Sequence, residues 1–221
     1  MLVKNRMTRA PVTVAPGDSL AHALRLTREH RIRHLPVVEG GVLAGIVSDR
    51  DMRLAMPSPL TVADAERADF LERTAVGEVM TRDVITAGPY DTLEDAAGQL
   101  CRHRVGSLPV VDAHGGLLGI VTETDILHAF AEILAAAGSS RLEIALPDRP
   151  GELSKALLIA GELRLNVTSL MVLPGETGEK KTAVVHVATI DPRELISALE
   201  AAGIEVGWPS LEGDLRKGMP S

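Results

Sequence analysis

Aromatic residues and cysteines are scarce in this chain of 221 residues. Phenylalanine, tryptophan and tyrosine together make up 2% of the residues, so a pocket for a flat heterocyclic ligand must rely on aliphatic side chains and backbone groups rather than on stacking rings. Cys101 is the only cysteine, which excludes an intramolecular disulfide and is typical of a reducing cytoplasm. We expect Cys101 to be a small buried residue on a helix rather than a catalytic nucleophile.

The sequence also lacks a run of about 18 apolar residues and an N-terminal signal peptide, so we expect a cytoplasmic protein without a membrane partner. The net charge of −7 disfavours binding to nucleic acid. The charge is uneven: residues 1–60 hold nine lysines and arginines against five acidic residues, whereas the remainder holds fourteen against twenty-five. The cationic N-terminal part suits a small anionic ligand.

An internal repeat is the most informative feature that is present. Met7-Thr8-Arg9 returns as Met80-Thr81-Arg82, Leu35-Pro36-Val37-Val38 as Leu108-Pro109-Val110-Val111, and Gly45-Ile46-Val47-Ser48 as Gly119-Ile120-Val121-Thr122. The second copy holds one extra residue in the turn between Asp112 and Gly116. Duplicated units commonly pack as a pseudo-symmetric pair, so equivalent clefts between the copies are the natural ligand sites.

Each copy is predicted to form strands and helices in the order β-α-β-β-α. In the first copy the elements are a strand at 12–14, a helix capped by Ser19, strands at 35–38 and 42–47, and a helix from Ser48. In the second they are a strand at Ile85, a helix at 91–101, strands at 108–111 and 117–121, and a helix from Glu123 to about Ala136. We place the repeats at 1–57 and 76–136, with a connector at 58–75 that contains a short helix at 62–71.

The C-terminal part is a different unit, at 139–208, that follows the boundary Ala137-Gly138-Ser139-Ser140. Its pattern predicts β-α-β-β-α-β, with strands at 141–146, 167–173, 182–189 and 204–208 and helices at 150–163 and 192–202. Residues 209–221 are expected to be a flexible tail. The fold class is therefore α+β.

Two short motifs carry the strongest sign of ligand binding. Ser48 and Thr122 each open a helix after an apolar strand, and Asp51 and Asp125 follow three residues later. A hydroxyl and free backbone N–H groups at a helix start can hold phosphate, Arg50 adds a guanidinium, and a carboxylate can accept the hydroxyls of a ribose. The alternative is that each pair is only a capping box. Two copies in register favour nucleotide binding.

These motifs resemble the CBS domain family. Gly45-Ile46-Val47-Ser48-Asp49-Arg50-Asp51 and Gly119-Ile120-Val121-Thr122-Glu123-Thr124-Asp125 fit the family signature Gly-hydrophobic-x-Ser/Thr-x-x-Asp, over about residues 1–136. The resemblance implies a regulatory pair that binds adenine nucleotides between its copies. It places Ser48 and Thr122 at phosphate, Asp51 and Asp125 at ribose, and the base beside the opposite copy's leading segment, at Met80 and Ile85 or at Met7 and Val12.

The two copies differ in charge, which predicts unequal sites. Arg33 and His34 of the first copy correspond to Gly106 and Ser107, and Arg50 corresponds to Thr124. We therefore expect the Ser48 site, with Arg33 and His34, to favour a phosphorylated ligand such as AMP, ADP or ATP. The Thr122 site is expected to be weak, empty or suited to an uncharged nucleoside. His30 and His103, each followed by arginine, are interpreted as cations at helix ends rather than metal ligands.

The C-terminal unit resembles an ACT domain, a small ferredoxin-like βαββαβ module. The resemblance rests on Asp148-Arg149-Pro150-Gly151 at a strand-to-helix turn and on the element order. It implies an amino-acid site at Asp148, Gly151, Glu152 and Asn166, where these residues alternatively only shape the turn. ACT domains commonly pair edge to edge, so a homodimer or a higher homo-oligomer is expected.

The order CBS–CBS–ACT resembles bacterial regulatory proteins of the acetoin-utilisation type. We therefore expect a non-catalytic sensor with an adenine nucleotide as regulatory ligand, no required cofactor, and an unidentified protein partner. The sequence shows no catalytic triad, P-loop or metal cluster. The alternatives are an enzyme or enzyme subunit that acts on the bound nucleotide, and a dimeric scaffold with vestigial pockets.

Overall fold

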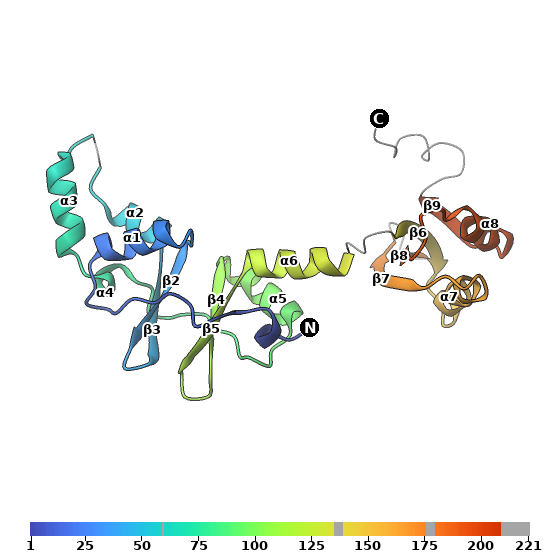
Figure 1. Ribbon diagram of the computed structural model, residues 1–221, viewed down its shortest axis with the longest axis horizontal. Helices are drawn as coiled ribbons and strands as arrows, with labels where there is room; N and C mark the ends of the chain where they lie inside the picture. Colours follow the sequence, from blue (N-terminus) through green and yellow to red (C-terminus); the bar gives the residue numbers. More distant parts are fainter. Residues whose placement is uncertain (59, 135–138, 176–179, 209–221) are drawn as a thin grey trace. The chain divides into compact units, whose positions relative to one another are not determined.

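The computed structural model describes residues 1–58, 60–134, 139–175 and 180–208 (Figure 1). The chain forms two compact units, Met1–Ala129 and Phe130–Ser221, each considered by itself below. Within the described ranges no helix is both long and apolar enough to cross a membrane. The expected flexible tail at 209–221 lies outside the described residues.

The first repeat contains α1 (Leu20–Glu29), β2 (His34–Glu39), β3 (Val42–Ser48) and α2 (Asp49–Ala55). As predicted, Ser19 caps α1: its Oγ accepts a hydrogen bond from the backbone N–H of His22 at 3.2 Å. Strands β2 and β3 pair antiparallel as a hairpin. Gly40 and Gly41 both have positive φ at its tip, which is the backbone that a tight hairpin turn requires.

The second repeat contains α5 (Leu93–His103), β4 (Ser107–Val111), β5 (Leu117–Thr122) and α6 (Glu123–Leu134). The turn that holds the extra residue is organised by Asp112, whose Oδ1 accepts backbone N–H bonds from His114 at 2.8 Å and Gly116 at 2.9 Å. The prediction for Cys101 was wrong, because this residue is exposed. Leu100, its neighbour on α5, is the residue that turns into the core.

The leading segments differ from the prediction. The strands expected at 12–14 and at Ile85 are reduced to single parallel bridges, Val14 to Val37 and Ala87 to Val110. Prolines flank both bridges (Pro11 and Pro16 in the first copy, Pro89 in the second) and cannot donate to a ladder. The structure has instead a short β1 (Thr8–Arg9) preceded by the 3₁₀ turn η1 (Val3–Asn5).

Each leading segment packs on the opposite repeat. β1 pairs with β5 of the second repeat, and Thr81 bridges Ile46 of the first. Val3 belongs to the core of the second repeat, whereas Val76 and Met80 belong to the core of the first. Figure 1 shows η1, near the N-terminus, beside α5. This exchange ties the repeats into one unit and brings the start of each beside the end of the other.

The connector between the repeats forms two helices, α3 (Asp64–Arg73) and α4 (Val76–Val79). The sequence predicted the first but not the second. α3 has no fully buried residue, whereas α4 places Val76 in the first repeat's core. Its last residue is followed directly by Met80 and Thr81, so α4 sets the position of the second repeat's leading segment.

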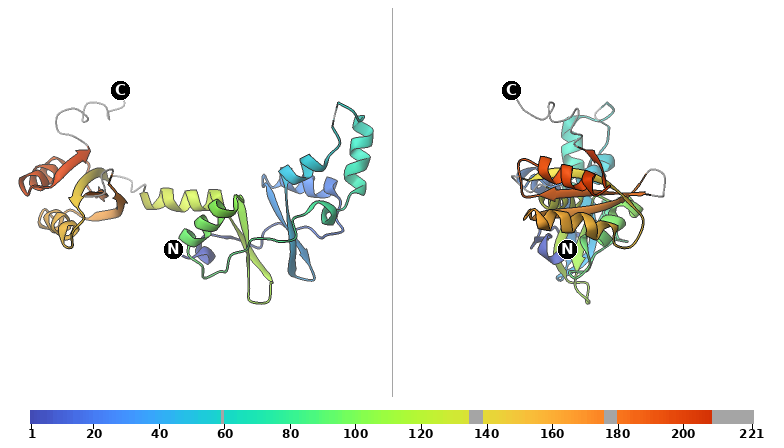
Figure 2. Two further views of the ribbon diagram at one scale, coloured as in Figure 1. Left: turned by 180° about the vertical axis from the view of Figure 1, so that it is seen from behind. Right: turned by 90° about the vertical axis from the view of Figure 1, so that its right-hand side faces the viewer.

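The C-terminal unit contains β6 (Ser140–Pro147), α7 (Glu152–Glu162), β7 (Val167–Pro174), β8 (Lys180–Val187), α8 (Arg193–Ala201) and β9 (Glu205–Trp208). This is the β-α-β-β-α-β order predicted from the sequence. The strands form one antiparallel-paired sheet in the order β7-β8-β6-β9. Both helices cover the same face of that sheet (Figure 2), around a core that includes Leu142, Ile144, Val185 and Ile196.

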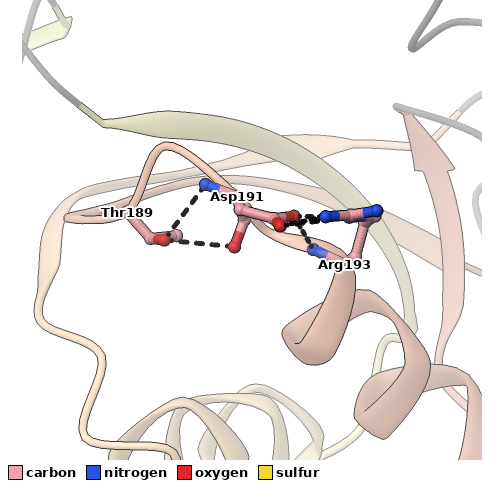
Figure 3. A network of polar contacts seen from close by, with 3 residues as sticks. All are labelled: Thr189, Asp191 and Arg193. Carbon is pink, nitrogen blue, oxygen red and sulfur yellow. Dashed lines mark hydrogen bonds and ion pairs between the residues drawn. The ribbon is translucent and has the colours of Figure 1, made fainter.

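A polar network marks the start of α8, where Pro192 occupies the cap position and makes no side-chain cap bond. Asp191 takes over this role (Figure 3): its Oδ1 accepts bonds from the backbone N–H of Arg193 at 3.2 Å and from Arg193 Nε at 2.8 Å. The Thr189 hydroxyl holds the turn, accepting from the Asp191 backbone N–H at 3.2 Å. The bonds from Arg193 lower the pKa of Asp191 to about 2.

Candidate functional site

Two cavities lie in the N-terminal unit. The Ser48 cavity, of about 280 Å³, is lined among others by Ser48, Arg50, Asp51, Ile85, Arg104 and Ser107. The Thr122 cavity, of about 430 Å³, is lined among others by Val12, Arg31, Arg33, Thr122, Thr124 and Asp125. Each cavity combines the strand-to-helix junction of one repeat with the leading segment of the other. The exchange of leading segments is therefore what creates both cavities.

The junction at Ser48 is a complete capping box. Asp51 Oδ2 accepts hydrogen bonds from the Ser48 hydroxyl at 2.6 Å and from the Ser48 backbone N–H at 3.0 Å, and the backbone N–H of Asp51 donates to Ser48 Oγ at 3.2 Å. Arg50 is exposed at the cavity, and Asp51 is half-buried. Among the described residues these bonds use Oδ2 alone, so Oδ1 keeps its lone pairs for a ligand.

The junction at Thr122 repeats this geometry. Asp125 Oδ2 accepts from the Thr122 hydroxyl at 2.7 Å and from its backbone N–H at 2.8 Å, while the backbone N–H of Asp125 donates to Thr122 Oγ1 at 3.3 Å. The junction can therefore be a helix cap and a ligand-binding site at the same time. The cap orients the carboxylate and the cavity gives it access to a small molecule.

Met7 and Met80 do not line either cavity, although Val12 and Ile85 do. Met80 is only 8% exposed and belongs to a core. A Cβ on Gly45 would lie 2.6 Å from Met80 Sδ, and a Cβ on Gly119 would lie 2.8 Å from Met7 Sδ. The two methionines therefore pack over the glycines of the opposite repeat and help to fix the exchanged segments there.

Arg33 lies at the Thr122 cavity, not at the Ser48 cavity where the sequence argument placed it. The backbone oxygen of Arg33 accepts a bond from the Asp49 N–H of its own repeat at 2.9 Å, while residues 30–34 line the cavity that holds Thr122. The packing of the two repeats therefore places Arg33 at the Thr122 cavity. His34 lines both cavities. Arginines therefore line both cavities. The charge difference on which we based a preference of the Ser48 site for phosphate is not present in the structure.

Two further cavity residues, Arg31 and Arg104, were not predicted from the sequence. These equivalent residues, which follow the repeated histidines, line the Thr122 and Ser48 cavities respectively. Both have φ of 54°, in the left-handed region that non-glycine residues rarely adopt. Their repetition 73 residues apart in the sequence was the available signal. Within the described ranges no group of three or more histidine, cysteine and acidic side chains could hold a metal ion.

In the C-terminal unit the four predicted residues do not meet. Gly151, with φ of 92°, forms the turn before α7, beside Asp148 and Glu152. Asp148 pairs with Lys181 at 2.7 Å, and Glu152 pairs with Lys155 at 2.7 Å. Asn166 precedes β7 at the opposite end of the sheet, because β7 runs parallel to β6 and eight residues of strand span about 26 Å.

Comparison with known proteins identifies relatives that share most of the chain or a little over half of it. The family model described as "CBS domain" matches residues 3–58 and 76–132. The inosine-5'-monophosphate dehydrogenase of Korarchaeum cryptofilum is 31% identical over 94% of this chain, which spans 37% of the enzyme's length. The CBS domain-containing protein YhcV of Bacillus subtilis is 36% identical over 56% of this chain and 81% of its own length.

Three solved structures share the fold of the N-terminal unit. A Vibrio cholerae protein named AcuB, for acetoin utilization, is 32% identical, with a TM-score of 0.52 over 61% of this chain and 93% of its own. CBSX2 in complex with AMP is 32% identical, with a TM-score of 0.50 over 61% and 98%. The CBS domain pair of protein MJ0100, with 5'-methylthioadenosine and S-adenosyl-L-methionine, is 30% identical, with a TM-score of 0.50 over 60% and 97%.

Proposed function

The chain belongs to the family of CBS-domain proteins, and from that premise we propose that it is a non-catalytic sensor of an adenine nucleotide or a related adenosine compound. The observation that carries the proposal is the pair of equivalent cavities, each with a carboxylate that is oriented by a cap and keeps one oxygen for a ligand. AMP, methylthioadenosine and S-adenosylmethionine in two similar structures support adenosine as the shared chemical group.

In this proposal the cavity residues divide the ligand among them. Asp51 and Asp125 accept the ribose hydroxyls at Oδ1, and Ile85 and Val12 contact the base. The Ser48 and Thr122 hydroxyls lie toward the phosphate. Both cavities accept a phosphorylated ligand, because each is lined by two arginines: Arg50 and Arg104 in the Ser48 cavity, Arg31 and Arg33 in the Thr122 cavity.

Calorimetric titration with AMP, ADP, ATP, methylthioadenosine and S-adenosylmethionine tests the proposal on the full chain. We expect at least one of them to bind to two sites. Asp51→Ala should weaken binding at the Ser48 site and Asp125→Ala binding at the Thr122 site by at least tenfold, since losing two hydrogen bonds to a carboxylate costs more than about 1.4 kcal/mol.

Asp49→Ala is the matched control. Asp49 lies on the same helix as Asp51, but its carboxylate forms an ion pair with Arg53 at 3.0 Å. This variant should bind as the wild type does. Flat titrations with all five compounds, or equal losses in Asp49→Ala and Asp51→Ala, would overturn the proposal and leave the junctions as capping boxes.

For the C-terminal unit we propose a ferredoxin-like ACT domain that binds an amino acid or related metabolite and forms a homodimer. Its element order and the left-handed Gly151 turn support this. Asn166 can complete the site only from a second copy: antiparallel pairing of two β7 edges would bring it to the Asp148 end of the partner. A thermal-shift screen of the amino acids, repeated with Asn166→Ala, tests the site. Stabilisation that Asn166→Ala leaves unchanged would contradict a shared site.

We propose that ligand binding changes the protein's contact with a partner protein in the cytoplasm. A link to acetoin metabolism rests on the likeness to AcuB, which covers 61% of this chain. Deleting the gene and measuring growth on acetoin tests that link. Unchanged growth would set it aside without touching the sensor function.

A further inference from the structure

His34 occupies a position that no other described histidine shares, because it lines both cavities. It opens β2 and pairs across the hairpin with Ser48. Its ring lies against the second repeat: a Cβ on Gly106 would be 3.0 Å from His34 Cε1 and 3.2 Å from Nε2. The absence of a side chain at Gly106 is what lets one imidazole reach the boundary between the two sites.

The pseudo-symmetric counterpart of His34 is Ser107, so the second repeat has no titratable group at this point. Ser107 is 4% exposed, and its Oγ is buried without a hydrogen-bond partner in the described part of the chain. The duplication has thus left one ionisable ring that both cavities share.

The charges around His34 come from several elements. Arg33 precedes it, Asp49 and Asp51 belong to α2, and Glu123 belongs to α6. The cavities add further ionisable groups at His30, Arg31, Arg50, Asp83, Arg104 and Asp125. Burial, with Arg33, lowers the pKa of His34, and the three nearby carboxylates oppose this. The ring is therefore neutral at neutral pH without a ligand, and a phosphate beside it favours the charged form.

We propose that His34 is a phosphate-binding histidine common to both cavities, so that the two ligand sites are coupled through one proton. This inference rests on the proposed nucleotide binding. A phosphate in either cavity stabilises the protonated ring, which takes its proton from solvent and donates an N–H bond to the phosphate. A phosphate that enters the second cavity finds the ring already partly charged and requires only the remaining fraction of that one proton.

The test measures proton uptake on AMP binding, from calorimetry of the full chain at pH 7.5 in buffers of different ionisation enthalpy. We expect a fractional proton to be taken up with AMP by the wild type and by each of Asp51→Ala and Asp125→Ala, because either remaining site uses the same ring. The total for two bound AMP should not exceed one proton, because a single ring serves both sites. Methylthioadenosine, which has no phosphate, should bind without uptake.

Two histidine variants identify the group. His34→Gln should remove the buffer dependence and weaken AMP several-fold at both sites, whereas His30→Gln, a second histidine at the Thr122 cavity, should keep the uptake. Uptake that survives in His34→Gln, occurs in only one single-site variant, or exceeds one proton when both sites fill would overturn the inference. AMP binding without proton uptake would overturn it alone, while a flat AMP titration would count against the nucleotide proposal as well.

Discussion

At the scale of the residue, the junction carboxylates have a structural role that precedes any ligand. Asp51 and Asp125 each accept two bonds from their cap residue through one oxygen. The same interactions stabilise the start of the helix and fix the orientation of the second oxygen. A substitution there therefore changes stability as well as binding, and the two effects have to be measured separately.

Asp125→Ala separates them. Without ligand we expect a loss of about 1 kcal/mol in the free energy of unfolding, as is usual when a capping interaction is removed. Urea denaturation measures it. AMP at one hundred times its Kd should raise the free energy of unfolding by about 2.7 kcal/mol for each occupied wild-type site. The contribution of the Thr122 site should be lost in the variant. A variant as stable as the wild type would show that the cap contributes nothing.

We expect a buried histidine to make the stability of the C-terminal unit depend on pH. His186 is 7% exposed, its Nδ1 lies 2.8 Å from Ser169 Oγ, and burial, with Arg141, lowers its pKa. Below the unfolded value of about 6.5 the unfolded chain binds more protons than the folded one. The unfolding free energy should therefore fall as the pH decreases from 7.5 to 5.5.

His186→Gln should reduce this pH dependence, as measured by denaturation of the full chain at both pH values. The same substitution at exposed His114 is the control and should leave it unchanged. A pH dependence that is identical in wild type and His186→Gln would assign the effect to other groups.

At the scale of the element, two glycines allow the exchanged segments to approach β3 and β5. A Cβ on Gly45 would lie 2.9 Å from the backbone oxygen of Thr81, and one on Gly119 would lie 2.7 Å from that of Thr8. A backbone oxygen cannot move aside as a side chain can. The glycine of the repeated Gly-Ile-Val motif therefore serves the contact between the repeats.

Gly45→Ala should accordingly lower the free energy of unfolding by about 1–3 kcal/mol through overpacking. Gly98→Ala is the matched control: Gly98 lies inside α5 with no atom near its missing Cβ, so this change should stabilise by about 0.5–1 kcal/mol. Chemical denaturation compares the two variants. A neutral Gly45→Ala would mean that the segments can separate at little cost.

At the scale of the whole molecule, the two units have separate cores. Among the residues that the structure describes, the core around Ile144 and Ile196 contains residues of the C-terminal unit only, and the two cores of the repeats contain none of them. Expressed alone, residues 1–134 should fold cooperatively, as followed by circular dichroism, and bind AMP as the full chain does. A fragment that unfolds or loses AMP binding would show that the repeats depend on the C-terminal unit.

The sequence by itself determined most of the elements, because these depend on local signals. The Ser19 cap, the Gly40-Gly41 turn and the apolar periods predicted α1, the two hairpins and the βαββαβ order of the C-terminal unit. The repeat itself predicted paired cavities, since duplicated residues recur at equivalent places. The prediction of strands at Val12 and Ile85 was wrong, because flanking prolines limit the ladder of hydrogen bonds that apolar residues would otherwise form.

Only the tertiary structure decided which residues share a cavity. The packing of the two repeats placed Arg33 at the Thr122 cavity, added Arg31 and Arg104, and put His34 at both cavities. It also withdrew Met7 and Met80 to pack over glycines, while the course of β7 separated Asn166 from Asp148. Periodicity and caps act over a few residues along the chain, whereas the contacts of Met80 with Gly45 and of Met7 with Gly119 join positions 35 and 112 residues apart through packing that no local pattern encodes.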